Sequence, residues 1–459
     1  MPPSVLQAKP EEMDAAEKRE RYTVSIVGCG QIGVLHACLF AEAGFKVICV
    51  DTNQTIVNHL SKGKAPLLRQ ELESKLKTHV KTGRLTATND LKNAVSQSDV
   101  VIITISAKIN EKKKADCSNV ESACKQVGLG LRRGSLVIVV SAVGFGFMEG
   151  TIKEILENSS GLKAGADFGL AYSPIRVLKG ETLELLANNK RIVAALEKNS
   201  LSSASNILET IAKKGVKKAV NVKTAELAEL FETVQRDVNL ALANELAIFC
   251  EKAGVDYLEI FRLLNGSACD MVSLPKLAEE NTRKETHLLL EDAENLNVKL
   301  RIPTIAREIN EEIIKHTVNL TKSALRDCGK TLRRARIALL GIAQTSNMKS
   351  PTKNAAKELA EMLDARGAKV SLHDPYLSEN EIAEISYPLK KSLNEAVECA
   401  DCIILLTEHD QFKRLNLKKL KVMMKMPAAI VDLEGMVEPD KVEEEGFIYR
   451  GLGRGVWKK

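Results

Sequence analysis

The sequence lacks any apolar run long enough to cross a bilayer. A membrane helix needs about 18 or more consecutive apolar residues, and none occurs among the 459 residues. The first twenty residues are charged and have no apolar core, so we expect no secretory signal. Heptads, low-complexity tracts and short internal repeats are also missing. We therefore expect an ordinary globular protein with no membrane partner.

A second pair of closely spaced cysteines is missing as well. Among the ten cysteines, Cys399 and Cys402 have the CxxC spacing, but they lie in "ECADCIILL", which runs into an apolar strand. A structural zinc site needs four ligands, and no second pair or partnering histidines occur at metal spacing. We expect no metal site, and we expect reduced cysteines in the core and a cytoplasmic location.

The charge is mixed rather than segregated. The formal net charge is +6, and acids and bases alternate along the chain. Lysine-rich runs such as "NEKKKAD" and "LKKLKVMMKM" are typical of solvated faces. With no basic stripe, we expect no nucleic-acid partner.

Strand-like and helical segments alternate at both ends of the chain and leave a helical middle. The pattern predicts an α/β protein with two Rossmann-like parallel-sheet domains joined by an all-helical central segment. One long helix is expected from Thr224 to about Lys252, ended by Gly254. The expected divisions are a polar tail (1–21), disordered or helical, an NAD-binding Rossmann domain (22–220), a helical domain (221–332) and a second Rossmann-like domain (333–459).

The segment "VGCGQIG" carries the strongest motif. Gly28, Gly30 and Gly33 have the G-x-G-x-x-G spacing after a strand and before a helix. The glycines allow a tight turn, close approach of a pyrophosphate, and close packing of the helix. Asp51 ends the next strand, 18 residues after Gly33, where a carboxylate binds ribose hydroxyls and repels a 2′-phosphate. This context predicts NAD as the cofactor.

Several segments in order resemble the UDP-glucose/GDP-mannose dehydrogenase family. "ADFGLAYSPIRVLKG" is similar to the family's sugar loop, F-x-L-x-Y-x-P-E-R-x-x-P-G. "AELAELFETVQRDVNLALANELA" resembles its central dimer helix, and "YRGLGR" a family ending. The resemblance implies a UDP-sugar substrate, a homodimer, and oxidation of a CH₂OH group to a carboxylate in two hydride transfers through a cysteine thiohemiacetal.

The resemblance also assigns binding residues. Gln31 and Ile32, at the start of the helix, and Ser141 of the "VSA" segment are expected to join the cofactor site. Tyr172, Arg176 and Asn244 are expected to contact the sugar nucleotide.

The catalytic positions of the family are altered in this chain. Its loop acid, threonine, lysine, asparagine and nucleophilic cysteine correspond here to Ile175, Ala142, Glu229, Thr233 and a position near Arg283. Cys269, in "NGSACD", mimics the nucleophile's context, but it follows Asn244 at about half the family spacing. A buried cysteine at a helix end is the plainer interpretation.

Three functions stay open. The first is two-electron or redox-neutral, epimerase-type chemistry, with Tyr172, Glu229 or a histidine as base. The second is ordinary uronic-acid formation, with Cys269 as the candidate nucleophile. The third is a catalytically inactive homologue that still binds NAD or a nucleotide sugar.

Overall fold

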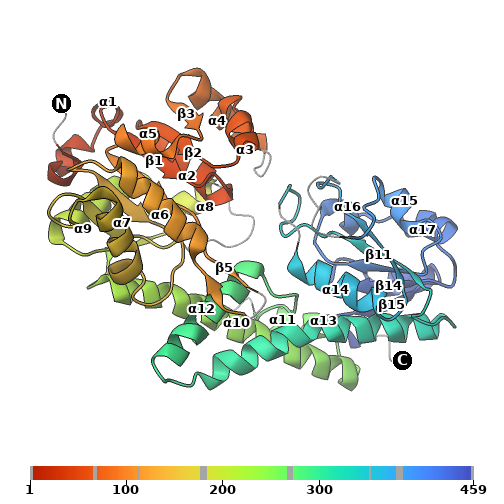
Figure 1. Cartoon of the computed structure of the whole chain (residues 1–459). Helices are drawn as coiled ribbons and strands as arrows, with labels where there is room; N and C mark the ends of the chain where they lie inside the picture. The colour runs from red at the N-terminus through yellow and green to blue at the C-terminus, as the bar shows by residue number, and fades with distance from the viewer. Residues whose placement is uncertain are drawn as a thin grey trace. The chain divides into compact units, whose positions relative to one another are not determined.

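The computed structural model describes residues 4–65, 70–110, 113–175, 183–265, 272–350, 353–378 and 386–455. The chain forms two compact units, shown together in Figure 1. The first comprises residues 1–232 and 287–298, and the second comprises residues 233–286 and 299–459. Each unit is built on its own sheet. In the described residues, no helix combines the length and apolar character needed to cross a bilayer.

The first unit contains an eight-stranded sheet of order β10-β9-β8-β7-β4-β1-β2-β3. All neighbouring strands are parallel except β8 and β9, which are antiparallel. Strands β4 and β7, with the sequences VVII and LVIV, are buried throughout, as expected for strands covered on both faces. The strands are β1 (Thr23–Val27), β2 (Lys46–Val50), β3 (Leu85–Thr88), β4 (Val100–Ile103), β7 (Leu136–Val139), β8 (Gly169–Tyr172), β9 (Arg191–Ala195) and β10 (Val216–Lys218).

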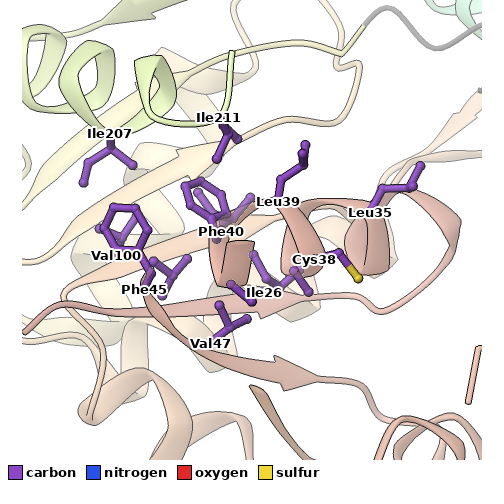
Figure 2. Close-up of a cluster of buried hydrophobic side chains, with 14 of the residues drawn as sticks. Ile26, Leu35, Cys38, Leu39, Phe40, Phe45, Val47, Val100, Ile207 and Ile211 are labelled. Carbon is purple, nitrogen blue, oxygen red and sulfur yellow. The ribbon is translucent and has the colours of Figure 1, made fainter. Parts of the chain in front are cut away.

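Helices flank this sheet and carry its core. Figure 2 shows Leu39 and Phe40 of α2 near Ile207 of α9, within one continuous cluster of buried side chains. On another part of the unit, α6 and α7 pack side by side (Figure 1). The helices are α2 (Gln31–Glu42), α3 (Gln54–Ser61), α4 (Gln70–Lys81), α5 (Leu91–Ser96), α6 (Ser118–Gly130), α7 (Lys153–Ser160), α8 (Leu183–Asn188) and α9 (Lys198–Glu209), with η3 (Met148–Ile152) before α7 and the small hairpin β5–β6 (Lys108–Ile109, Ala115–Asp116) before α6.

The amino-terminal segment packs against the first unit. It forms the short helices η1 (Val5–Gln7), η2 (Pro10–Glu12) and α1 (Ala16–Arg19). Val5 and Met13 are buried in the same cluster as α2, and the Ser4 hydroxyl donates to the Gly134 carbonyl at 2.9 Å. The described part of the tail, which was expected to be disordered or helical, therefore forms short helical segments joined by irregular backbone. The apolar positions Val5 and Met13 supply the anchoring that a polar composition concealed.

Four helices form the middle of the chain: α10 (Val222–Ala253), α11 (Tyr257–Leu264), α12 (Glu280–Asn295) and α13 (Arg301–Asp327). The long helix predicted over 224–252 is confirmed, and Gly254 follows it in the left-handed conformation, with φ of 73°. Among the apolar side chains of this helix, Leu230, Val234 and Ala241 are buried within the chain, whereas Leu242 is exposed.

The second unit contains a five-stranded parallel sheet of order β12-β11-β13-β14-β15. The α/β architecture with two Rossmann-like sheets and a helical middle is thus confirmed. Cys402 lies in β13, where burial raises its thiol pKa, so the CxxC spacing marks a core position. The elements are β11 (Arg336–Leu340), α14 (Asn354–Asp364), β12 (Lys369–His373), α15 (Leu393–Val397), β13 (Cys402–Leu405), α16 (Asp410–Lys413), α17 (Leu417–Met423), β14 (Ala429–Asp432), α18 (Pro439–Glu444) and β15 (Ile448–Gly451).

Candidate cofactor and sugar site

The glycine turn after β1 has the geometry of a dinucleotide-binding turn. Gly28 lies in the left-handed region, with φ of 94°, and its amide donates to the Val50 carbonyl of β2 at 2.9 Å. A Cβ atom at Gly33 would lie 1.9 Å from the Gly28 carbonyl oxygen. The close packing of helix on turn therefore requires glycine at this position.

Gly30 caps the amino terminus of α2 and faces open space. No side chain caps this helix, and a Cβ atom built on Gly30 would meet nothing within 4 Å among the described atoms. Gln31 and Ile32 are the first residues of α2. The first amides of a helix have no partner within the helix and bind phosphate readily. The turn thus presents free space beside helix amides, as a pyrophosphate requires.

Asp51 follows β2 directly and is fixed by two backbone amides. Its Oδ2 accepts from the Cys29 amide at 2.8 Å, and its Oδ1 accepts from the Asn53 amide at 2.8 Å. The residue is half-buried, and each carboxylate oxygen retains lone-pair capacity for a ribose hydroxyl. Together with the glycine turn, this position fits the adenosine half of NAD.

Ser141 lies just beyond β7, at the carboxyl edge of the same sheet. Its residue is 6% exposed, and its hydroxyl has no hydrogen-bond partner among the described residues. The sheet order reverses between β1 and β4, and ligands of open α/β sheets bind outside the strand ends at such a switch point. Because β7 is next to β4, Ser141 stands on the side expected for the nicotinamide half.

The sugar-loop segment begins as a strand. Ala171 and Tyr172 belong to β8, so the loop expected from Ala171 onward starts later, at Ser173. Tyr172 is fully buried. Ile175 donates its amide to the Val140 carbonyl at 3.2 Å and packs against the core of the first unit. An apolar residue at the position of the family's acid is therefore part of the core. Arg176 lies outside the described residues.

Helix α10 carries Glu229 and Thr233, which the resemblance aligns with the family's lysine and asparagine. Glu229 is buried, with 2% of its surface exposed. Thr233 is also buried, and its hydroxyl donates to Glu285 Oε2 at 2.5 Å and accepts from Arg236 Nη2 at 2.9 Å. The hydroxyl of Thr233 is thus already committed to neighbouring side chains.

Asn244 lies further along α10, in a buried network of the second unit. Its Nδ2 donates to Asn310 Oδ1 at 2.9 Å, and its Oδ1 accepts from the Lys276 amide at 3.0 Å. The residue is fully buried. These bonds place Asn244 in the scaffold that supports the backbone at Lys276, rather than in an open pocket.

Arg283, near which the resemblance would place the family's nucleophile, forms ion pairs. Arg283, in the first turn of α12, donates from Nη1 to Glu358 of α14 at 2.7 Å, and its Nε lies 3.8 Å from Glu311 of α13. The guanidinium therefore joins three helices of the second unit. Cys269 lies outside the described residues.

The second sheet repeats the turn of the first. Gly341 has φ of 83°, and its amide donates to the His373 carbonyl at the end of β12. Asp374 follows β12 as Asp51 follows β2, and its Oδ2 accepts from the Ala343 amide at 2.8 Å. His409 also contacts this oxygen, at 3.2 Å from its Nε2, and both side chains are fully buried. Sequence analysis missed this carboxylate, although "SLHDP" places it directly after a strand.

The profile of the UDP-glucose/GDP-mannose dehydrogenase family matches this chain in three parts. Its NAD-binding domain matches residues 22–213, its central domain 223–312, and its UDP-binding domain 338–439.

Similar proteins span the same length. The UDP-N-acetyl-D-mannosamine dehydrogenase of Pyrococcus horikoshii is 30% identical, over 94% of this chain and 99% of the relative. A solved structure of UDP-D-ManNAc dehydrogenase from Pyrococcus horikoshii superposes with a TM-score of 0.85 at 29% identity, covering 95% of this chain and all of the other. An NDP-N-acetyl-D-galactosaminuronic acid dehydrogenase from Methanosarcina mazei gives 0.77 at 28% identity, covering 97% and 99%.

The glycine turn, the two sheets and the order of the matched domains agree with one another along the whole chain. The chain therefore belongs to the UDP-glucose/GDP-mannose dehydrogenase family, and it carries that family's NAD-binding, central and UDP-binding domains.

Proposed function

We propose that this protein binds NAD and a UDP-sugar, and that it performs hydride chemistry limited to a two-electron or redox-neutral, epimerase-type reaction. The observation that carries the proposal is Arg283. The resemblance would place the family's nucleophile near Arg283, whose guanidinium pairs with Glu311 and Glu358. A guanidinium stays protonated and has no lone pair for attack on an aldehyde, so the thiohemiacetal route has no nucleophile there.

Two buried residues of α10, Thr233 and Glu229, support the same restriction to two-electron or redox-neutral chemistry. NAD, when bound, supplies the hydride acceptor. Oxidation of an alcohol then needs a base for its proton and donors for the developing oxyanion. Thr233 is already committed to Glu285 and Arg236. Glu229 is a buried carboxyl group on α10, and a negative charge opposes an oxyanion.

A redox-neutral reaction makes smaller demands. If a ring hydride is removed and then returned to the opposite face, a single base suffices and neither a thiolate nor water is consumed. Tyr172 and Glu229 remain the candidate bases, both held on regular elements of the first unit. Relatives of this chain are named for UDP-N-acetyl-D-mannosamine, so N-acetylated UDP-hexosamines are the first substrates to test.

The test is incubation of the purified protein with NAD and a panel of UDP-hexoses and UDP-N-acetylhexosamines. NADH absorbance counts the hydrides retained, and NMR identifies the sugars. We expect interconverted or keto sugars and no uronic acid. Two NADH per sugar with a uronic acid would refute the proposal, and the loss of that activity in Cys269→Ser would identify the nucleophile.

A binding role without catalysis is the second candidate. The observations that favour it are the engaged groups of Asn244 and Thr233, whose polar atoms bond within the protein. Under this alternative, calorimetry gives saturable NAD and UDP binding, while every sugar in the panel is recovered unchanged. Sugar conversion at any measurable rate excludes it.

We also propose that the protein is a homodimer formed through the helical middle. Leu242, Leu246 and Phe249 follow one another at helical spacing on α10 and are 53%, 39% and 68% exposed. These exposed side chains are available to a second copy, whereas Leu230 and Val234 of the same helix are buried. Light scattering should give a dimer that Phe249→Glu converts to monomer. A wild-type monomer at micromolar concentration would exclude it.

A further inference from the structure

The loop after β7 depends on contacts with other elements to keep one conformation. It runs from Ser141 to Phe147, before η3, and contains two glycines, Gly144 and Gly146. Gly146 lies in the left-handed region, with φ of 76°. Glycine has the largest conformational freedom of any residue, so this loop would not keep one conformation through its own side chains.

Two carboxylates from the helical segment bind the backbone of this loop. Glu226 of α10 is fully buried and accepts from the Gly146 amide at 2.7 Å and from the Met148 amide at 2.9 Å. Asp292 of α12 accepts from the Phe145 amide at 2.7 Å. Three amides between Phe145 and Met148 are thus held by two acids.

The loop backbone packs closely against the Asp292 carboxylate. A Cβ atom at Gly144 would lie 3.1 Å from Asp292 Oδ1, so a larger residue would displace the carboxylate. Lys223, one turn before Glu226, lies 5.7 Å from the centre of the Phe145 ring and pairs with Glu149 of η3 at 3.4 Å. Lys223 therefore contacts both the ring of Phe145 and the helical turn that follows the loop.

The same stretch of α12 reaches the loop that follows β4. Glu291 Oε2 accepts from the Ala115 amide at 2.8 Å, and Glu294 pairs with Lys114 at 2.9 Å. Strands β4 and β7 are neighbours in the parallel sheet, so both loops leave its carboxyl edge. Consecutive acids of one helix thus fasten the two loops on the nicotinamide side of the switch point.

We infer that Glu226, Asp292 and Glu291 are positioning residues that fix the loops after β4 and β7 for the cofactor. The inference rests on the NAD binding proposed above. Helix α12 contributes Arg283 near its start, and Glu291 and Asp292 near its end. Asp292 thus holds the Phe145 amide in the loop that begins at the buried Ser141.

The experiment combines amide exchange with NAD titration in the full-length protein. In wild type, the amides of Phe145, Gly146 and Met148 should exchange slowly. Glu226→Gln should speed exchange at Gly146 and Met148, and Asp292→Asn should speed exchange at Phe145. Each variant should weaken NAD binding about tenfold, because a hydrogen bond that orders the loop is lost. Glu149→Gln is the matched control, with an acid removed nearby and NAD affinity unchanged.

UDP titration separates this effect from general destabilisation. The UDP-binding domain belongs to the second unit, so UDP affinity should stay within twofold of wild type in both variants. Faster amide exchange with unchanged NAD affinity would overturn the inference and leave the NAD proposal intact. Unchanged exchange in both variants would overturn it as well. If wild type binds no NAD while its loop amides are protected, the proposed function and the inference both fail.

Discussion

The two glycine turns of this protein share a backbone design and differ in what fills it. In each unit a left-handed glycine follows the first strand, and an aspartate after the second strand accepts a hydrogen bond from a turn amide. Asp51 is half-buried, and among the described residues its hydrogen bonds come from the backbone amides of Cys29 and Asn53. Asp374 is fully buried and shared with His409.

The segment after each turn widens the difference. Gly30 leads straight into α2 and leaves open space beside the first amides. The second turn continues through a longer segment whose own groups bond one another. The Thr345 amide donates to Ser350 Oγ at 2.9 Å, and the Asn347 amide donates to His409 Nδ1 at 2.9 Å. The same strand–turn–strand frame therefore leaves open space beside the helix amides in one unit, whereas its aspartate is engaged by a buried histidine in the other.

The largest expected effect sharpens the contrast between two glycines of one turn. Gly33→Ala should lower the free energy of unfolding by about 4 kcal/mol, because its Cβ would overlap the Gly28 carbonyl, the severe end of overpacking. Gly30→Ala should change it by less than about 0.5 kcal/mol, since the new Cβ meets open space. Urea unfolding of both variants measures the difference. Equal losses of stability in the two variants would show that the contact between Gly33 and the Gly28 carbonyl does not limit side-chain size in this turn.

Removal of each aspartate tests the comparison directly. Asp374→Ala should cost about 3 kcal/mol of stability, because the Ala343 and Tyr376 amides and His409 lose a buried acceptor. NAD affinity should not change. Asp51→Ala should do the reverse, with a stability loss of about 1 kcal/mol and NAD binding weakened at least tenfold. If Asp374→Ala weakens NAD more than Asp51→Ala does, the assignment of the open turn is wrong.

The open turn should lose its ligand without losing its fold. Gly30→Val should weaken NAD binding about 100-fold, equivalent to roughly 2.7 kcal/mol, by filling the space expected for the pyrophosphate. Its melting temperature without ligand should stay near that of wild type. Calorimetry with NAD and NADP provides the measurement. Wild-type affinity in Gly30→Val would remove the turn from the cofactor site.

A pH series distinguishes the two units by their buried acids. Burial raises the pKa of Glu226 from 4.5 to about 7, and burial raises the pKa of Asp432 in the second unit from 3.8 to about 6. A raised pKa means that the folded state binds more protons. The free energy of unfolding should therefore fall as pH rises from about 4.5 to 7, by on the order of 2 kcal/mol for Glu226.

Glu226→Gln should flatten the upper part of that slope, and Asp432→Asn should flatten only its lower part. Denaturant unfolding between pH 4 and 8 provides the measurement. A wild-type slope of opposite sign in this window would contradict the burial of Glu226.

The smallest effect concerns cofactor choice. Asp51→Asn keeps the acceptor for the Cys29 amide but removes the charge. NADP binding should improve about fivefold relative to NAD, because the repulsion of a 2′-phosphate is lost. Competitive titration of the two cofactors measures the ratio. An unchanged ratio would mean that another group, rather than this carboxylate, selects NAD.

Local patterns were enough for the fold, and they also carry the prediction of the adenosine half of the cofactor site. The G-x-G-x-x-G spacing, the strand-end Asp51 and the apolar strands are short-range signals, since each depends on residues that are neighbours in the chain. The helix over 224–252 was predictable for the same reason. Strand β15 was not predicted as a strand, because its four residues carry no long apolar run.

Sequence alone indicated the two Rossmann-like halves and the NAD turn, and it predicts the loss of the family's nucleophile near Arg283. Only the tertiary structure decided the partners of Arg283. The ion pairs of Arg283 and the bonds of Glu226 and Asp292 to loop amides join residues 28 to 147 positions apart. The periodicity of the sequence does not predict such pairings, because the packing of helices and strands decides which charged groups come together. The same reason explains why Asp51 and Asp374, alike in sequence context, differ in burial and in side-chain partners.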